Sequence, residues 1–157
     1  MKFADFICPE AVKANLTSSS KEDVIREMAT SLLEAGQIDE DQFESIVSAI
    51  LAREELGSTG IGRGVAVPHT KHASVDRLVG TCAVSHEGID FAALDGETVH
   101  LFFLLISHPD RSVDHLRALE SITRQLRNET FCRFLKQAKT EDEIRQLLEE
   151  SDANQLG

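Results

Sequence analysis

The chain has 157 residues, of which 41% are hydrophobic and 27% are charged, and its formal net charge is −11. A chain of this length and composition is expected to fold as one globular domain with a packed core. The acidic balance, without a cluster of Lys and Arg, argues against nucleic acid as a partner, because phosphates need clustered cations. An acidic surface suits a basic protein partner, or serves solubility alone.

The cysteines and the apolar segments indicate the compartment. Cys8, Cys82 and Cys132 form no CxxC pair, so neither a disulfide framework nor a thiolate zinc site is predicted. The N-terminal residues lack the apolar run of a signal peptide, and no apolar stretch reaches the roughly 18 residues that a membrane span needs. We therefore expect a soluble, cytoplasmic protein with reduced thiols and no membrane insertion.

Two amphipathic helices are predicted in the first third of the chain. Residues 20–35 have apolar side chains at helical spacing, with Ser20 as the N-cap and Gly36 as the residue that ends the helix. A second helix follows Asp39, which we expect to cap it together with Gln42. The apolar stripe of this second helix contains Phe43, Ile46, Val47, Ile50 and Leu51.

The hydrophobic period of the middle segment is that of β-strands. Residues 64–69 and 77–85 are short β-branched runs bounded by Gly, Pro and Ser. An Asp-Gly turn at residues 95–96 precedes residues 99–106, which are apolar at nearly every position from Leu101 onwards. Such a run is expected of a strand that is covered on both faces.

Helical spacing returns after residue 112 and predicts three more helices. The first has the apolar stripe Val113, Leu116, Leu119, Ile122 and Leu126. The second starts from an Asn128 cap and the third from a Thr140–Glu143 capping box. Residues 151–157 lack a core-forming pattern and are expected to fray, which leaves a domain at residues 3–150. The order of elements predicts an α/β fold, a three-layer α/β/α sandwich with a mixed β-sheet flanked by helices on both faces.

The segment at residues 57–72, GSTGIGRGVAVPHTKH, is unusually rich in glycine. The third glycine of GIGRG comes one residue too early for a dinucleotide-binding fingerprint, and no Gly-Lys-Ser/Thr closes a P-loop. The segment is therefore either a turn that feeds a strand or a loop whose backbone N–H groups approach an anion.

Three side chains could carry chemistry near this segment. His69 follows Pro68 at a predicted strand end, so its direction is well defined. With Ser112 as N-cap, His115 would be the third residue of its helix and would face inward, near N–H groups that favour an anion and a neutral imidazole. Arg53 ends the second helix, where a guanidinium could bind phosphate or complement the helix C-terminus. Each of these residues could also be purely structural.

A metal site is the competing interpretation. The HxxH pair of His69 and His72, with His115, could hold zinc in a hydrolase. HExxH is absent, however, and HxxH outside a helix does not place both rings on one side. We therefore predict no metal and no other cofactor.

Three motifs together resemble one family. REELGSTGIGRGVAVPH, GIDFAALDGETVHLFFLL and DHLRALESITRQL are similar, in order and spacing, to the type-2 IIA components of the phosphoenolpyruvate-dependent phosphotransferase system. This class comprises the fructose, mannitol and nitrogen-regulatory IIA proteins. The resemblance covers residues 3–150 and implies an α/β/α sandwich.

The resemblance also implies a role for each candidate residue. His69 would accept the phosphoryl group at its tele nitrogen from the histidine-containing phosphocarrier protein, His115 would stabilise it, and Arg53 would contact it. A phosphate loop would comprise Ser58, Thr59, Gly60, Gly62 and Gly64. The acceptor would be a cysteine of a IIB component in sugar uptake, or the phosphorylation state would control binding to regulatory targets. Thr70 and the loop at residues 107–114 depart from the family pattern, which affects partner choice.

Overall fold

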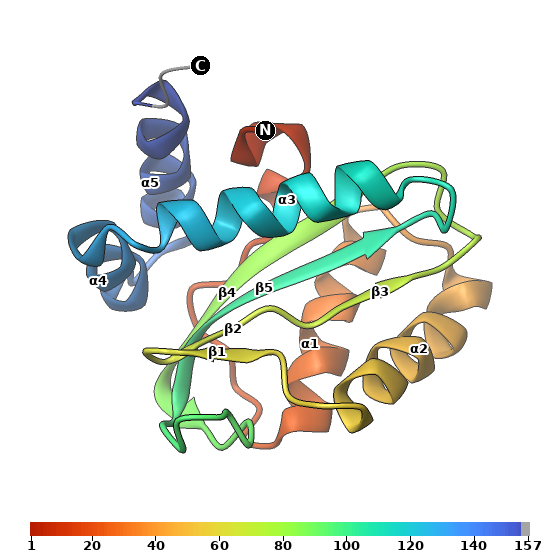
Figure 1. Cartoon of the computed structure of the whole chain (residues 1–157), viewed down its shortest axis with the longest axis horizontal. Coiled ribbons are helices and arrows are strands. Elements are labelled where there is room, and N and C mark those ends of the chain that lie inside the picture. The colour runs from red at the N-terminus through yellow and green to blue at the C-terminus, as the bar shows by residue number, and fades with distance from the viewer. Residues whose placement is uncertain (155–157) are drawn as a thin grey trace.

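The protein is a three-layer α/β/α sandwich, described by a computed structural model over residues 1–154 (Figure 1). The helices are α1 (Lys21–Glu34), α2 (Phe43–Glu55), α3 (Ser112–Gln125), α4 (Glu129–Gln137) and α5 (Glu141–Ala153). The strands are β1 (Gly60–Gly62), β2 (Val65–Ala66), β3 (His69–Lys71), β4 (Val79–Ile89) and β5 (Val99–Ser107). Short 3-10 turns cover Phe3–Asp5, Pro9–Ala11 and Glu40–Gln42. The predicted architecture is confirmed.

Strand β5 is the centre of a mixed sheet. Along one edge it pairs in parallel first with β2, where Val65 lies opposite Leu101, and then with β3, where His69 lies opposite Leu105. Its other edge pairs antiparallel with β4, and β1 extends the sheet from β2. The parallel strands β2 and β3 therefore follow one another along the same edge, and His69 lies towards the C-terminal end of β5.

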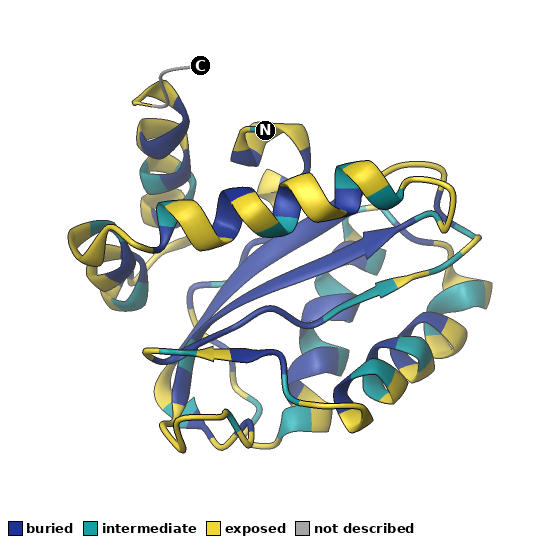
Figure 2. Cartoon of the chain, in the orientation of Figure 1, coloured by how far each residue is buried: buried dark blue, intermediate teal, exposed yellow. Residues whose placement is uncertain are grey.

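The side chains of β5 alternate between two cores because successive residues of a strand point to opposite faces. Phe102, Leu104 and Ile106 pack in the core that α1 and α2 cover. Leu101, Phe103 and Leu105 pack in the second core, together with residues of α3, α4 and α5. Figure 2 shows β4 and β5 buried between these layers. The continuous apolar run in the sequence thus reflects a strand covered on both faces, as predicted.

Most predicted helix ends agree with the structure. The Ser20 hydroxyl accepts the N–H of Asp23, the Asn128 side chain accepts that of Phe131, and the Thr140 hydroxyl accepts that of Glu143. Gly36 follows α1 with a φ of 75°, a conformation that glycine adopts without strain.

The expected start of α2 needs correction. A 3-10 turn precedes this helix, and the Asp39 side chain makes no capping hydrogen bond within residues 1–154.

Two further corrections concern α3 and the C-terminus. Helix α3 begins at Ser112 itself, and its inward face carries the small residues Ala118 and Ser121, so Val113 and Leu116 are 64% and 66% exposed. The fraying expected from residue 151 is wrong for Ser151–Ala153, which continue α5. The buried Asp152 carboxylate accepts the backbone N–H groups of Phe3 and Ala4, so it ties α5 to the N-terminus. Residues 155–157 of the predicted tail lie outside the described residues.

No helix within residues 1–154 combines the length and the hydrophobicity that crossing a membrane would require.

Candidate functional site

His69 has one ring nitrogen engaged and the other available. Strand β3 places the side chain beside β5, and the ring Nδ1 lies 2.8 Å from the carbonyl oxygen of Val67. A carbonyl can only accept, so Nδ1 must carry the proton and Nε2 must carry the lone pair. His69 is only partly buried, and its Nε2 takes part in no hydrogen bond within residues 1–154. This is the tele nitrogen that the sequence analysis singled out.

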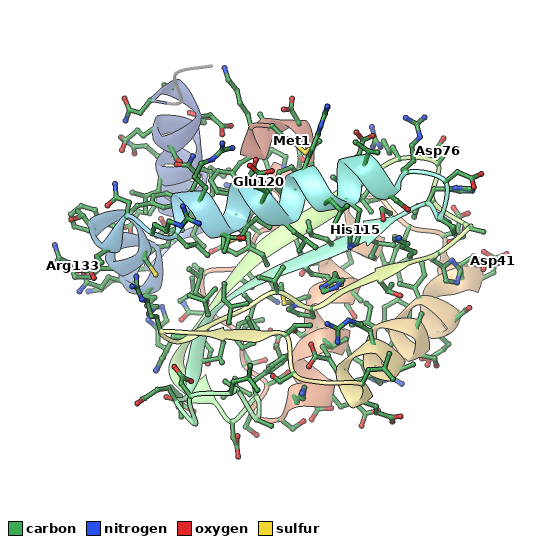
Figure 3. The ribbon with its side chains drawn as sticks, viewed as in Figure 1. Met1, Asp41, Asp76, His115, Glu120 and Arg133 are labelled. Carbon is green, nitrogen blue, oxygen red and sulfur yellow. The ribbon has the colours of Figure 1, made fainter. Side chains whose placement is uncertain are left out.

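His115 lies against His69. It is the fourth residue of α3, one place later than expected, and only 4% of it is exposed. Figure 3 shows it on the side of α3 that faces the sheet. The two imidazole centroids are 5.2 Å apart with the planes inclined at 61°, an edge-to-face contact. The structure thus joins two histidines that are 46 residues apart in the sequence.

Both histidines are held in the neutral form. Burial lowers the pKa of His69 and outweighs the Val67 carbonyl, which raises it, while the positive charges of Arg53 and Lys71 lower the pKa further. Burial lowers the pKa of His115 to about 4, with smaller contributions from His69 and Lys71. At neutral pH, His69 and His115 are therefore both neutral imidazoles, each with a single N–H.

Arg53 brings positive charge to this pair. It lies in the last turn of α2, and its Nη1 donates to the carbonyl oxygen of Gly57 at 2.8 Å. The guanidinium is near enough to His69 to affect its pKa, and Arg53 is only half-buried, so it can contact a second group. The structure therefore places Arg53 near His69, which in turn contacts His115.

Glu54 holds the start of the glycine-rich segment and was missed from the sequence. Its buried carboxylate accepts both the N–H and the hydroxyl of Thr59, and it pairs with Lys21 Nζ at 2.8 Å. The signal was available, because Glu54 falls on the apolar stripe of α2, where a charge needs a partner. The turn that leaves α2 is thereby held by Glu54, through Thr59, and by Arg53, through the Gly57 carbonyl.

The glycine-rich segment does not form a phosphate loop around His69. The N–H groups of Thr59 and Gly60 are bonded to Glu54 and to the Ser58 hydroxyl, and that hydroxyl donates to the carbonyl of Phe91. The rest of the segment includes strand β1 and its turn to β2, which agrees with the predicted alternative of a turn that feeds a strand.

Gly62 and Gly64 lie at the opposite end of β2 from the histidines. Both have positive φ, 94° and 77°, and both adjoin other parts of the protein. A Cβ at Gly62 would lie 3.3 Å from Asp95, and one at Gly64 would lie 3.1 Å from Lys136 Nζ. Four residues of strand, about 13 Å, separate the level of Val65 from that of His69. These glycines are turn residues of the sheet.

The predicted HxxH pair does not converge. The His72 ring bonds Ser45 Oγ through Nε2 at 2.8 Å and Ser74 through Nδ1, which accepts the Ser74 N–H. His72 thus connects α2 to the loop after β3. Within residues 1–154, no group of three or more His, Cys, Asp and Glu side chains is arranged to hold a metal ion.

Comparisons with known proteins identify the family of the chain. The family model for "Phosphoenolpyruvate-dependent sugar phosphotransferase system, EIIA 2" matches residues 5–151. The chain is 36% identical to the fructose-specific EIIABC component of Bacillus subtilis (strain 168), over 97% of this chain but only 24% of that protein.

Two nitrogen regulatory proteins match over nearly their full length. The one from Bradyrhizobium diazoefficiens is 35% identical over 94% of this chain and 95% of its own. The crystal structure of IIA-Ntr from Neisseria meningitidis has a TM-score of 0.83 at 26% identity, covering 93% of this chain and 98% of that one.

Proposed function

The chain belongs to the EIIA 2 family of the phosphoenolpyruvate-dependent sugar phosphotransferase system, and on that premise we propose that His69 carries the phosphoryl group. The donor is the histidine-containing phosphocarrier protein, and the acceptor is a cysteine of a IIB component. One observation carries the proposal: two neutral imidazoles meet edge to face, with the Nε2 atom of His69 unprotonated and available.

The chemistry needs only groups that the chain supplies. The Nε2 lone pair of His69 attacks phosphorus, and the donor's P–N bond breaks with its electron pair returning to the donor imidazole. Phosphorylated imidazole gains positive charge, which the Nδ1–H bond to the Val67 carbonyl stabilises. In the second step, a thiolate displaces the phosphoryl group and the electron pair returns to Nε2. Atoms and charges balance without a metal or a nucleotide.

Arg53 and His115 compensate the negative charge of the transferred group. Phosphoryl transfer depends on positioning and on electrostatic stabilisation more than on covalent help from the protein. Arg53 supplies a permanent charge, and His115 supplies one N–H donor. Arg53 belongs to α2 and His115 to α3, so different helices supply the two groups that contact the phosphoryl oxygens.

Exposed apolar side chains close in sequence to Arg53 and His115 suit a donor that is a protein. Leu56, three residues after Arg53, is 86% exposed, and Val113 and Leu116, which flank His115 in α3, are 64% and 66% exposed. Exposed large apolar side chains on or next to the helices that carry Arg53 and His115 are a feature of surfaces that bind other proteins. The exposure that contradicted the predicted stripe of α3 thus supports transfer between proteins.

The test is transfer of labelled phosphate from phosphoenolpyruvate through the general phosphotransferase proteins. We expect acid-labile phosphate on the wild-type chain, complete loss in His69→Ala, and retention in His72→Ala, a neighbouring histidine with both ring nitrogens engaged. Phosphorus NMR should assign the phosphate to Nε2. Equal labelling of His69→Ala, or no labelling of the wild type, would refute the proposal. If His115→Ala lost labelling as completely as His69→Ala, the roles of the two histidines would need revision.

A regulatory output is the second candidate function. It is favoured by the 35% identity to a nitrogen regulatory protein and by the TM-score of 0.83 to IIA-Ntr. The chemistry at His69 is the same, but the phosphorylation state would change which target protein binds. Transfer from the phosphorylated chain to a fructose-type IIB domain separates the candidates. Rapid transfer supports the carrier role, and stable phosphorylation in the presence of that domain supports the regulatory role.

A further inference from the structure

Ser107 is a buried hydroxyl placed directly behind His115. It ends β5, is fully buried, and its Oγ lies 2.6 Å from Nδ1 of His115. Its backbone is fixed by the register with Lys71 of β3, and its carbonyl accepts the N–H of His72. The strand that presents His69 therefore also holds Ser107 in place.

The position of one proton decides whether His115 can help. A neutral imidazole has a single N–H, on either Nδ1 or Nε2. With Nδ1 beside Ser107, Nε2 is the ring atom left for a phosphoryl oxygen. If Nε2 carried only its lone pair, it would repel the oxygen, whereas an Nε2–H group would donate to it.

Different hydrogen-bond partners determine which ring nitrogen carries the proton in His69 and in His115. The Val67 carbonyl can only accept, so the tautomer of His69 is fixed. A serine hydroxyl can donate or accept, so it can satisfy Nδ1 of His115 in the tautomer that the phosphoryl group requires. Without this hydroxyl, a buried Nδ1 lone pair would have no hydrogen-bond partner among residues 1–154.

We propose that Ser107 is a positioning residue: its Oγ–H donates to Nδ1 of His115, which holds the ring in place and keeps the proton on Nε2, aimed at the phosphoryl group on His69. This inference rests on the proposed function. Ser107 does not touch the phosphoryl group itself and acts only through His115.

The first experiment reads the proton directly and needs no phosphoryl transfer. Nitrogen-15 NMR of the wild-type, unphosphorylated protein should show His115 protonated at Nε2, with Nδ1 as a hydrogen-bonded acceptor. A proton on Nδ1 would overturn the proposal. Because this measurement does not depend on phosphorylation, its outcome is separate from the fate of the proposed function.

The second experiment uses a matched pair of variants. Ser107→Thr keeps the hydroxyl, and Ser107→Val has nearly the same shape without it. We expect Ser107→Val and Ser107→Ala to accept phosphate about tenfold more slowly than wild type, the effect of about one lost hydrogen bond, and Ser107→Thr to retain most of the rate. In Ser107→Val and Ser107→Ala, the Nδ1 resonance of His115 should move to that of an unbonded nitrogen.

A buried serine elsewhere controls for general destabilisation. Ser121 of α3 donates to the carbonyl of Met1, away from the histidines, so Ser121→Ala should label at the wild-type rate. Equal rates for Ser107→Thr and Ser107→Val would show that shape, and not the hydroxyl, matters, and would overturn the proposal. If no variant and no wild type were labelled, the proposed function would fail while the NMR result still decided the tautomer.

Discussion

The two ends of the glycine-rich segment have opposite characters. At the turn between β1 and β2, Gly62 and Gly64 adjoin Asp95 and Lys136, and the carbonyl of Gly64 accepts two backbone N–H groups. At the other end, His69 meets His115, and neither Nε2 atom takes part in a hydrogen bond within residues 1–154. Polar groups that are satisfied internally build the fold, and those left free can act on a ligand. Glycine density therefore marks a backbone requirement here and not an anion site.

The largest effect that would test this contrast is expected at Arg53. Arg53→Ala should slow phosphorylation of His69 about 100-fold, because removing a charge that stabilises the transferring group costs on that order. Arg53→Lys should recover part of the rate, since an ammonium supplies charge without the planar fork. The measurement is the initial rate of labelling from the phosphorylated donor protein.

Arg127 provides the matched control for Arg53. It lines the small hollow beside Gly62 and Arg63, at the turn end of the segment. Arg127→Ala should leave the labelling rate within about twofold of wild type. If it slowed labelling as much as Arg53→Ala, the turn end would belong to the site after all.

The features that could be predicted from the sequence are those controlled by hydrophobic periodicity and by local chemistry. Helix caps such as Ser20 and Asn128, the layers, and the inward direction of His115 follow from patterns within a few residues. Local pattern singled out Arg53, His69 and His115 as candidates, and the family resemblance implied a role for each. The sequence could not show which backbone N–H groups of the glycine-rich segment are already hydrogen-bonded within the fold, because some of their partners are distant in sequence. Asp95, whose carboxylate accepts the N–H of Arg63 from a distant part of the sequence, is an example.

The exposure of the apolar side chains of α3 could not be predicted from the sequence for a related reason. Val113 and Leu116 fit an apolar stripe, but small residues at Ala118 and Ser121 let a different face approach the sheet. Ser107 likewise looks like the end of an apolar strand until its distance to His115 is known. Helical periodicity identified an amphipathic helix there, and packing against the sheet determined which face is buried.

The next effect is the pH dependence of the unfolding free energy, which arises at the histidine end of the segment. Because folding lowers the pKa of His115 to about 4 from an ordinary 6.5, the unfolded chain binds more protons between these values. The stabilisation is complete above pH 6.5 and is lost as the pH falls towards 4. From pH 7 to pH 5 this one group should cost about 2 kcal/mol of unfolding free energy. The lowered pKa of His69 acts in the same direction.

Chemical denaturation across this pH range, comparing wild type with His115→Asn, isolates the contribution. The other titrating groups that affect the wild type remain in the variant, so the difference between the two curves should shrink by about 2 kcal/mol from pH 7 to pH 5. A constant difference would show that His115 is not held neutral by the fold, and a widening one would show that its pKa is raised.

The smallest effect is expected at the turn, from Gly64→Ala. Alanine at a φ of 77° is strained, and its Cβ would lie 3.3 Å from the carbonyl oxygen of Thr98, so the unfolding free energy should fall by about 1 kcal/mol or slightly more. Gly36→Ala, at a φ of 75° with nothing within 4 Å of its Cβ, measures the strain alone. Labelling of His69 should stay at the wild-type rate in both variants below their melting temperatures. A clear loss of labelling in Gly64→Ala but not in Gly36→Ala would mean that the turn shapes the site from about 13 Å away, and the two ends would then act as one unit.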